Sequence, residues 1–267
     1  MIGVAGCGRM GAPMLAALRA AGMNAAGFDV RSPDEFGALA PFMTDEATVF
    51  AQGAETLITV VRDIPQTDDV LFGAQGFVSA PNLQRIIICS TLSPRYVRGL
   101  RDRVPENIAL IDAPMSGAQI AAHEARLSFM LGGSKADLGA AQPLFAAMGK
   151  HFHHMGPFGS GMQAKVLNNL LAASNTAMTR LVLDWGDAAG LDEAALLGLI
   201  HTSSGQNWFA SGFEQIEFSR DGHDADNTIA ILVKDVESAL DATPDGADMS
   251  LPRQVQTALA KLNPRAG

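Results

Sequence analysis

A glycine-rich motif near the start of the sequence has the spacing of a dinucleotide-binding turn. Residues 6–11, Gly-Cys-Gly-Arg-Met-Gly, follow a short apolar segment, residues 1–5, and precede a helical pattern over residues 12–21. In such a strand–turn–helix unit the first glycine makes the tight turn. The second lets the backbone approach a pyrophosphate, and the third lets helix and strand pack closely. The free N–H groups at the helix start attract phosphates. The predicted cofactor-binding residues of the turn are Gly6, Gly8, Arg9, Met10 and Gly11.

A carboxylate stands where the second strand of this unit is expected to end. Asp29 follows the apolar segment 24–28 and lies 18 residues after Gly11, a position from which an acidic side chain accepts hydrogen bonds from the adenosine ribose hydroxyls. Its charge repels a 2'-phosphate, so Asp29 favours NAD. Arg31 carries a guanidinium that could contact that phosphate, which keeps NADP open. A turn-forming carboxylate is the alternative to the cofactor role of Asp29.

A lysine and an asparagine lie one helical turn apart in the second half of the sequence. Lys165 and Asn169 fall within residues 162–189, a stretch with no proline and one glycine in which apolar residues recur at helical spacing. Residues i and i+4 of a helix share one face, so the two side chains can address the same small molecule. This geometry suits a catalytic pair. The alternative is a solvent-facing lysine on an amphipathic helix.

The elements that must position these residues alternate between short apolar segments and helical patterns in the first part of the chain. This alternation predicts an α/β fold, with a Rossmann-type doubly wound parallel sheet over residues 1–158 and an all-α domain over residues 159–267, joined by the long helix. The expected strands are residues 1–5, 24–28, 55–61, 84–89, 109–112 and 127–131. The expected helices include residues 12–21, 135–148, 162–189, 192–200, 229–240 and 253–262.

The composition argues against several classes of protein. The formal net charge is −9 at pH 7 and the 19 Lys and Arg residues are scattered, so we expect no nucleic-acid partner. No apolar run reaches the roughly 18 residues that span a bilayer, and no basic segment precedes the first apolar residues, so we expect neither a membrane span nor a targeting segment. Two cysteines, Cys7 and Cys89, are too few for a disulfide framework, which suits the cytoplasm. The apolar helical half predicts a homo-oligomer, a dimer or a tetramer.

Four stretches of the sequence together resemble the β-hydroxyacid dehydrogenase family, specifically 3-hydroxyisobutyrate dehydrogenases and relatives that reduce tartronate semialdehyde, glyoxylate or succinic semialdehyde. Their order and spacing match over roughly residues 1–255. The stretches are residues 6–14; residues 112–117 (Asp-Ala-Pro-Met-Ser-Gly) followed by 127–133; residues 159–161 leading to Lys165 and Asn168-Asn169; and Lys234-Asp235 together with Ser90-Thr91.

The resemblance assigns the acid–base role to Lys165. Oxidation of an alcohol by hydride transfer requires a base that takes the hydroxyl proton, and in the reductive direction the ammonium serves as the acid. Lysine must be neutral to act as the base, and both apolar walls and the positive nicotinamide ring of the oxidised cofactor disfavour the ammonium. The resemblance also implies that Asn169 orients the substrate, while Ser116 and the backbone N–H of Gly117 hold its carboxylate.

The remaining cofactor contacts are likewise implied by the resemblance. Thr91 is expected near the nicotinamide and its ribose, and Val61 and Arg62 are expected to approach the cofactor through their backbone. Lys234 is expected to reach it from the helical domain. The expected cofactor is NAD, with NADP as the second option. The alternative for Lys234-Asp235 is an ordinary pair of surface charges.

The chain departs from the family pattern near the expected substrate site. Where relatives have further glycines after the Ser-Gly pair, this chain has Ala118, Ile120 and Ala125, and Arg62 stands where they often have proline. The predicted function is hydride transfer between a nicotinamide cofactor and a small 3-hydroxy acid or its semialdehyde. The alternatives are a glyoxylate, succinic or tartronate semialdehyde reductase, or a dinucleotide-binding protein without turnover. An imine reductase shares the architecture, but Lys165 speaks against it.

Other reactive side chains make weaker candidates. The imidazoles of His151, His153 and His154 crowd together but lack spaced cysteine or carboxylate partners, so we expect no metal site. Ser90 and Ser116 do not lie in a G-x-S-x-G elbow, which disfavours hydrolase chemistry. The segment 204–208, which ends in Trp208, resembles the hydroxyisobutyrate branch, where an aromatic residue lines the pocket. Simple packing is the alternative for this tryptophan.

Overall fold

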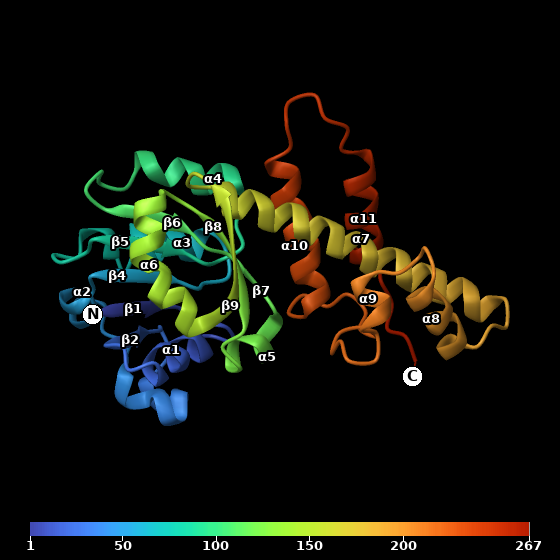
Figure 1. Ribbon diagram of the computed structural model, residues 1–267, viewed down its shortest axis with the longest axis horizontal. Coiled ribbons are helices and arrows are strands. Elements are labelled where there is room, and N and C mark those ends of the chain that lie inside the picture. The colour runs from blue at the N-terminus through green and yellow to red at the C-terminus, as the bar shows by residue number, and fades with distance from the viewer. Residues whose placement is uncertain (267) are drawn as a thin grey trace. The chain divides into compact units, whose positions relative to one another are not determined.

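The computed structural model of the chain describes residues 1–266. These residues form two compact units, Met1–Lys165 and residues from Val166 onward. The helix α7 (Ser160–Ala188) begins in the first unit and continues in the second (Figure 1). The predicted α/β fold class, a Rossmann-type sheet followed by a helical part, is confirmed.

In the first unit, all of whose residues are described, nine strands form one sheet. Six of them run parallel in the order β3-β2-β1-β4-β5-β6, which is the doubly wound order of dinucleotide-binding sheets. The direction of winding reverses between β1 and β4. In sheets of this order the ligand-binding crevice lies beyond the carboxyl ends of the two strands at the reversal. The strands are β1 (Ile2–Ala5), β2 (Ala25–Phe28), β3 (Met43–Thr44), β4 (Thr56–Thr59), β5 (Arg85–Ile88), β6 (Ala109–Asp112), β7 (Met115–Ser116), β8 (Leu127–Gly132) and β9 (Gly149–Gly156).

The far edge of the sheet differs from the parallel arrangement that the sequence predicts. Strand β8 runs antiparallel to both β6 and β7, and β9 runs parallel to β8. Strands β3, β7 and β9 were not predicted. The first two have only two residues each, too few for a periodic pattern, and the histidines of β9 are exposed. The chain reverses between β6 and β8 through the short β7 and the helix α5 (Ala118–His123).

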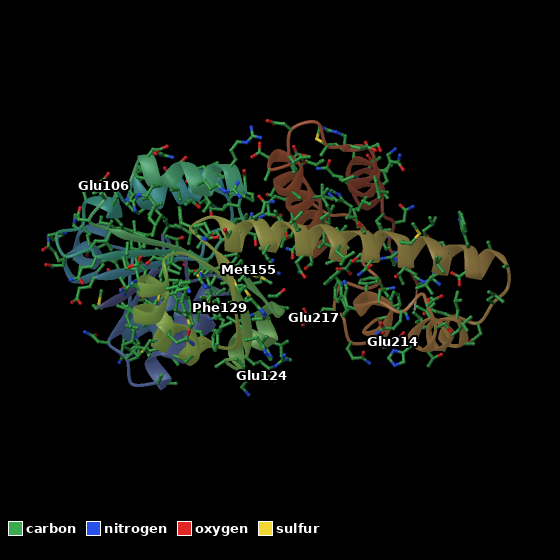
Figure 2. All side chains as sticks on the ribbon, turned by 45° about the horizontal axis from the view of Figure 1, so that its top comes forward. Glu106, Glu124, Phe129, Met155, Glu214 and Glu217 are labelled. Atoms are coloured by element: carbon green, nitrogen blue, oxygen red, sulfur yellow. The ribbon has the colours of Figure 1, made fainter. Side chains whose placement is uncertain are left out.

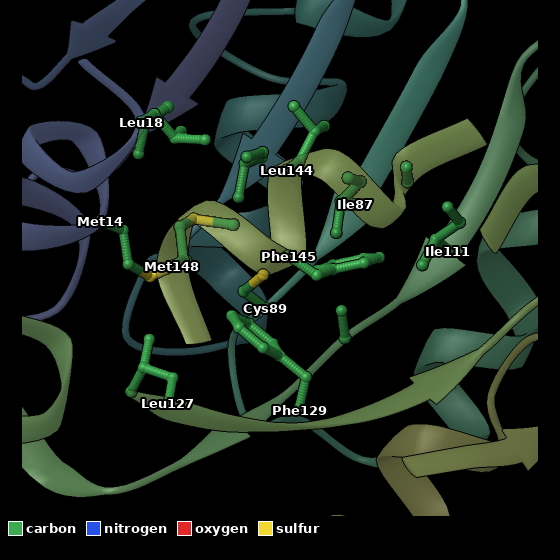
Figure 3. Packing of buried hydrophobic residues seen from close by; sticks show 14 of the residues in the cluster. Met14, Leu18, Ile87, Cys89, Ile111, Leu127, Phe129, Leu144, Phe145 and Met148 are labelled. Carbon is green, nitrogen blue, oxygen red and sulfur yellow. The ribbon is translucent and has the colours of Figure 1, made fainter. Parts of the chain in front are cut away.

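Side chains that alternate along the strands fill two apolar clusters, one on each face of the sheet. In β5, Ile87 belongs to one cluster, whereas Ile86 and Ile88 belong to the other. Helices α1 (Gly11–Ala20), α5 and α6 (Lys135–Met148) cover the first face. Helices α2 (Ala47–Gly53), α3 (Ile64–Leu71) and α4 (Pro94–Gly99) cover the second. In the first cluster, Phe145 of α6 lies against Phe129 of β8, with ring centroids 5.3 Å apart (Figure 3). This double covering buries the sheet and leaves its carboxyl ends to form the site.

In the second unit, the regular elements of the described residues, 166–266, are all helices. After α7 come α8 (Glu193–Thr202), α9 (Trp208–Ser211), α10 (Thr228–Asp241) and α11 (Ser250–Ala260). Apolar residues of α7, α10 and α11 form its main core. The surface carries acidic side chains such as Glu214 and Glu217, consistent with the net negative charge (Figure 2). None of the helices in the described residues combines the length and apolar character that crossing a bilayer takes.

Candidate active site

The glycine turn between β1 and α1 has the geometry that its spacing predicts. Gly6 has a φ of +90°, and a Cβ there would lie 2.6 Å from the carbonyl oxygen of Val60. A Cβ on Gly11 would collide with the carbonyl oxygen of Gly6, whereas a Cβ on Gly8 would meet nothing within 4 Å. Helix α1 therefore packs tightly against the turn, while the backbone at Gly8 faces open space.

The start of α1 is suited to a phosphate group. Its N-cap, Met10, provides no side-chain hydrogen bond, and the first turn contains no acidic residue. The first N–H groups of a helix lack intrahelical partners and carry the positive end of the helix dipole. Together with the open backbone at Gly8, this arrangement fits the pyrophosphate of a dinucleotide.

Asp29 follows β2 and holds a dense set of hydrogen bonds beside this turn. Its Oδ2 accepts a hydrogen bond from the backbone N–H of Cys7 at 2.9 Å. The Arg31 side chain donates to both carboxylate oxygens, from Nε at 3.0 Å and Nη2 at 3.2 Å. Burial acts to raise the pKa of Asp29, but the hydrogen bonds and charge of Arg31 outweigh it and lower that pKa. The carboxylate is therefore ionised and tied to the turn.

Arg31 lies over the carboxylate and is not directed away from it. Besides its two bonds to Asp29, its Nη2 donates to the carbonyl oxygen of Cys7 at 3.2 Å. The guanidinium also stacks over the ring of Phe36, 4.7 Å from the centroid. The side chain remains about half exposed, so a 2'-phosphate would have to compete with Asp29 for it.

The other residues that we expect near the cofactor follow the carboxyl ends of β4 and β5. The backbone N–H of Val61 donates to Ser90 Oγ at 2.9 Å, and that of Arg62 donates to Gln66 Oε1 at 3.0 Å. Thr91 comes directly after Ser90 and is half-buried. Hydrogen bonds thus connect the ends of the two central strands. The backbone N–H groups of Val61 and Arg62 are therefore already engaged within the protein.

The Ser-Gly pair of the expected substrate signature lies at the end of β7. Ser116 pairs with Ser128 of β8, and Gly117, with a φ of +131°, precedes α5. Ala118 and Ala125, two of the positions that depart from the family glycines, have φ values of +53° and +49°. Both alanines therefore occupy the left-handed region that favours glycine. The backbone keeps a glycine-like path here, while the added methyl groups change the local surface.

Lys165 stands on the second turn of α7 and is 7% exposed. This burial contradicts the alternative of a solvent-facing lysine. The start of α7 is held by Asp112, at the end of β6, whose Oδ1 accepts from the N–H of Gly159 at 2.6 Å and whose Oδ2 accepts from that of Met162 at 2.5 Å. Asp112 begins the motif of residues 112–117, but the spacing of that motif indicated no role for it.

In the second unit, Asn169 is buried on α7 and Lys234 lies on α10. Asn169 Nδ2 donates to Asp235 Oδ2 at 2.6 Å, and Lys234 Nζ lies 3.4 Å from Asp235 Oδ1. Asp235 is 3% exposed, so the alternative of an ordinary surface pair is wrong for this residue. Asp235 fixes the orientation of the Asn169 amide, a role that the sequence did not indicate.

The histidines and the tryptophan that the sequence raised lie elsewhere. His151, His153 and His154 are exposed on β9. Within residues 1–266 there is no group of three or more His, Cys, Asp or Glu side chains that could hold a metal ion. Trp208 begins α9 and is 44% exposed, and its ring lies 5.6 Å from that of Phe209. A second ring, that of Phe218, lies 6.4 Å from it, so Trp208 takes part in packing while remaining partly exposed.

Comparison with known proteins agrees with this geometry. Residues 1–156 match the family model described as the NAD binding domain of 6-phosphogluconate dehydrogenase. Residues 159–266 match the model described as NAD-binding of NADP-dependent 3-hydroxyisobutyrate dehydrogenase. The chain is also 34% identical over 208 residues to the NAD-dependent L-serine dehydrogenase of Pseudomonas aeruginosa, covering 76% of this chain and 70% of that relative. The chain belongs to the β-hydroxyacid dehydrogenase family.

Two further members of the family extend the match along the chain. The mitochondrial 3-hydroxyisobutyrate dehydrogenase of Rattus norvegicus is 30% identical over 252 residues, covering 90% of this chain and 75% of that protein. The solved structure of the Mycobacterium tuberculosis 3-hydroxyisobutyrate dehydrogenase with L-serine has the same fold, with a TM-score of 0.81, 24% identity, and coverage of 98% of this chain and 95% of that one. As a member of the β-hydroxyacid dehydrogenase family, the protein is an NAD(P)-dependent oxidoreductase. It transfers a hydride between the nicotinamide cofactor and a small 3-hydroxy acid or its semialdehyde.

Proposed function

We propose that Lys165 is the acid–base residue of this dehydrogenase and that Asn169 orients the substrate beside it. The observation that carries this proposal is the burial of both side chains one turn apart on α7, at 7% and 9% exposure. A buried lysine is uncommon unless it has a specific role, because removing the ammonium from water is costly.

Lys165 exchanges a proton with the substrate hydroxyl in this proposal. In the oxidative direction the substrate hydroxyl gives its proton to the neutral Nζ of Lys165 as the C–H bond breaks, and in the reductive direction the ammonium returns it. The bound nicotinamide supplies the hydride acceptor or donor. Asn169, held by Asp235 through one amide N–H, has its second N–H available for a substrate oxygen. Ser116 and the N–H of Gly117 hold the substrate carboxylate.

The cofactor is bound by the turn of the sheet domain, residues 1–158, and by Lys234 of the helical domain, residues 159–267. The Gly6–Gly11 turn would hold the phosphates, with Arg9 and Met10 beside them. Asp29 accepts from the adenosine ribose hydroxyls, which makes NAD the preferred cofactor over NADP. Support comes from the open backbone at Gly8 and the ionised carboxylate of Asp29.

The remaining cofactor contacts come from the ends of the central strands. Thr91 would lie near the nicotinamide ribose, and Val61 and Arg62 would contact the cofactor from the end of β4. The hydrogen bond between Val61 and Ser90 at 2.9 Å supports this arrangement, because it fixes the two strand ends that border the crevice. The chain works in the cytoplasm.

The substrate is a small 3-hydroxy acid of the size of L-serine or 3-hydroxyisobutyrate. The named relatives act on these two compounds, which share a carboxylate and a hydroxyl on the third carbon. A panel of both, together with glyoxylate, tartronate semialdehyde and succinic semialdehyde in the reductive direction, ranks the candidates by kcat/KM. Turnover confined to the three aldehydes would replace the oxidative assignment by a reductase.

The protein forms a homo-oligomer, a dimer or a tetramer, through its helical half. Large apolar side chains of α7 support this, because Leu167, Leu171, Met178 and Trp185 are 55%, 64%, 60% and 68% exposed and their spacing of four, seven and seven residues places them on one face of the helix. Contiguous exposed apolar surface of this kind is typical of an interface. Size-exclusion chromatography with light scattering measures the subunit number, and a monomer at micromolar concentration would contradict this assignment.

The decisive experiment compares Lys165→Ala and Lys165→Arg with the parent. We expect Lys165→Ala to lower kcat by about 10² to 10⁴, the range of general acid–base catalysis, while NADH binding stays within threefold. Lys165→Arg should be almost as poor, because guanidinium keeps its proton near neutral pH. Steady-state rates and a titration of NADH fluorescence supply both quantities. If Lys165→Ala keeps kcat within about threefold of the parent, the lysine is not the acid–base residue.

A further inference from the structure

The start of α7 is capped by a side chain from a distant strand. Gly159 is the residue before the helix, and its carbonyl accepts the first helical bond, from Gln163 N at 3.1 Å. The N–H groups of Gly159 and Met162 are the two donors that a local capping box would satisfy. Gly159 has no side chain, and Met162 has no side-chain oxygen that could accept such a bond. Asp112 accepts both, one on each carboxylate oxygen, from 47 and 50 residues away in the sequence.

Local geometry explains why the cap comes from β6 and not from the chain beside it. Gly159 has a φ of +90°, and a Cβ there would lie 2.5 Å from Arg98 Cγ. The serine, threonine or aspartate that usually caps a helix would be strained and crowded in this position. The carboxylate of Asp112, with the residue 0% exposed, takes over that function.

The residues of β8 and of the start of α7 pack tightly around the carboxylate of Asp112. A Cβ on Gly132 of β8 would collide with Asp112 Oδ1, and a Cβ on Gly161 would collide with the carbonyl oxygen of Met130. Met162 is fully buried, and its sulfur accepts a contact from the N–H of Leu92 at 3.3 Å. The first turn of α7 is thus fixed to the ends of β6 and β8.

We propose that Asp112 is a positioning residue for Lys165, acting through the two hydrogen bonds that hold the first turn of α7. Lys165 follows Met162 by three residues, so one turn of rigid helix carries the position of the cap to the lysine. Acid–base groups lose much of their effect when displaced by about 1 Å. This inference rests on the role proposed for Lys165.

The buried charge of Asp112 is unfavourable for stability but suits a residue that holds the start of α7 in one position. Burial raises the pKa of this carboxyl to about 6, although the N–H bonds from Gly159 and Met162 and the charge of Arg98 oppose the rise. At neutral pH the group is therefore an ionised carboxylate inside the protein. Hydrogen bonds to an ionised acceptor are shorter and stronger than neutral ones, which suits an anchor that must hold one geometry.

Asp112→Asn is the sharpest probe of this anchor. The amide has the shape of the carboxylate, but its single oxygen accepts from only one of the two N–H groups and its NH₂ faces the other. Ser134→Ala is the matched control, because Ser134 Oγ caps α6 in the same unit, accepting from Asp137 N at 3.1 Å, and has no bond to α7. Both variants remove a side-chain hydrogen bond at a helix N-terminus.

A double-mutant cycle with Lys165→Ala separates positioning from general damage. We expect Asp112→Asn to lower kcat by about 10 to 10² in the parent, with the NADH dissociation constant within threefold. In the Lys165→Ala background the same change should alter the residual kcat by less than threefold, because the group being positioned is gone. Ser134→Ala should leave kcat within threefold in both backgrounds.

Each result decides one of the two assignments. Full activity in Lys165→Ala overturns the role of the lysine and the positioning role with it. If Lys165→Ala is impaired, the positioning role alone is overturned in either of two ways: Asp112→Asn has no effect on the parent, or it lowers kcat equally in both backgrounds. Melting temperature and NADH binding establish that each variant is folded. Should Asp112→Asn not fold, Asp112→Ser, which leaves space for a water on the two N–H groups, goes through the same cycle.

Discussion

Replacing Asp29 by asparagine should shift the coenzyme choice of this dehydrogenase from NAD towards NADP. The carboxylate accepts from Cys7 N and from the Arg31 side chain at distances between 2.9 and 3.2 Å. The amide oxygen of asparagine can keep the bond to Cys7, so the glycine turn should stay in place. The amide NH₂ then faces the guanidinium of Arg31 and releases it. A released guanidinium beside the ribose is a good partner for a 2'-phosphate.

The size of the shift follows from the interactions exchanged. Hydrogen bonds to a charged group contribute about 1.5–3 kcal/mol, so the loss of the charged acceptor should weaken NAD by roughly 10- to 100-fold. Two unit charges 4 Å apart repel by about 4 kcal/mol at an effective dielectric constant of 20. Arg31 already offsets part of this repulsion in the parent, so we expect a gain of about tenfold for NADP. The ratio of kcat/KM values for NAD and NADP should therefore fall by at least about 10²-fold.

The assay is steady-state turnover with each coenzyme for the parent, Asp29→Asn, Arg31→Ala and the double variant. Arg31→Ala alone should make NADP worse, because the carboxylate is then uncompensated. The double variant should lack the gain for NADP, since the guanidinium that supplies it is absent. A parent that prefers NADP, or a ratio that moves by less than threefold in Asp29→Asn, would refute the assignment of Asp29 to the ribose.

Three other perturbations test the stability of the fold. Arg180→Met should lower the free energy of unfolding by about 2–4 kcal/mol in urea, because the 1% exposed guanidinium donates to three backbone carbonyls that would lose their partner. Ala125→Gly should raise it by about 0.5–1 kcal/mol, since the residue has a φ of +49°; a loss of stability would contradict this. Burial raises the carboxyl pKa of Asp112 to about 6, so the folded protein is more stable when this carboxyl group is protonated. Relative to Asp112→Asn, the parent should therefore lose about 2–3 kcal/mol as the pH rises from 4 to 7. A difference independent of pH would contradict the raised pKa.

Helix ends in this protein show what the sequence could and could not predict. Gly22 and Gly190 both follow helices in the left-handed conformation, with φ values of +76°, and glycine after an apolar periodic pattern is a reliable stop signal. Ala125 ends α5 in the same way. Its N–H bonds to Ala122 O at 3.2 Å, and the next N–H, of Arg126, bonds to Ala121 O at 2.9 Å. With alanine in place of glycine the signal is absent, so α5 was not predicted.

The candidate site divides along similar lines. The glycine turn, Asp29 and the pair Lys165 and Asn169 carry their information in local spacing, so their placement on elements was predictable, and their roles stay predictions. The partners of these residues come from distant segments. Asn169 is bonded to Asp235, 66 residues later, and a pattern of neighbouring residues contains no trace of such a contact.

The cap of α7 also explains why a buried carboxylate, that of Asp112, stands at the end of β6. The raised pKa means that ionisation of Asp112 at neutral pH costs stability relative to the unfolded chain. A neutral cap would avoid that cost, but the backbone at Gly159 excludes a capping side chain there, and an amide from β6 could satisfy only one of the two N–H groups. An ionised carboxylate is the small group that accepts both. The geometry of α7, and not stability, therefore accounts for the ionised carboxylate here, as expected if the role that we propose for Lys165 requires this helix to be held in place.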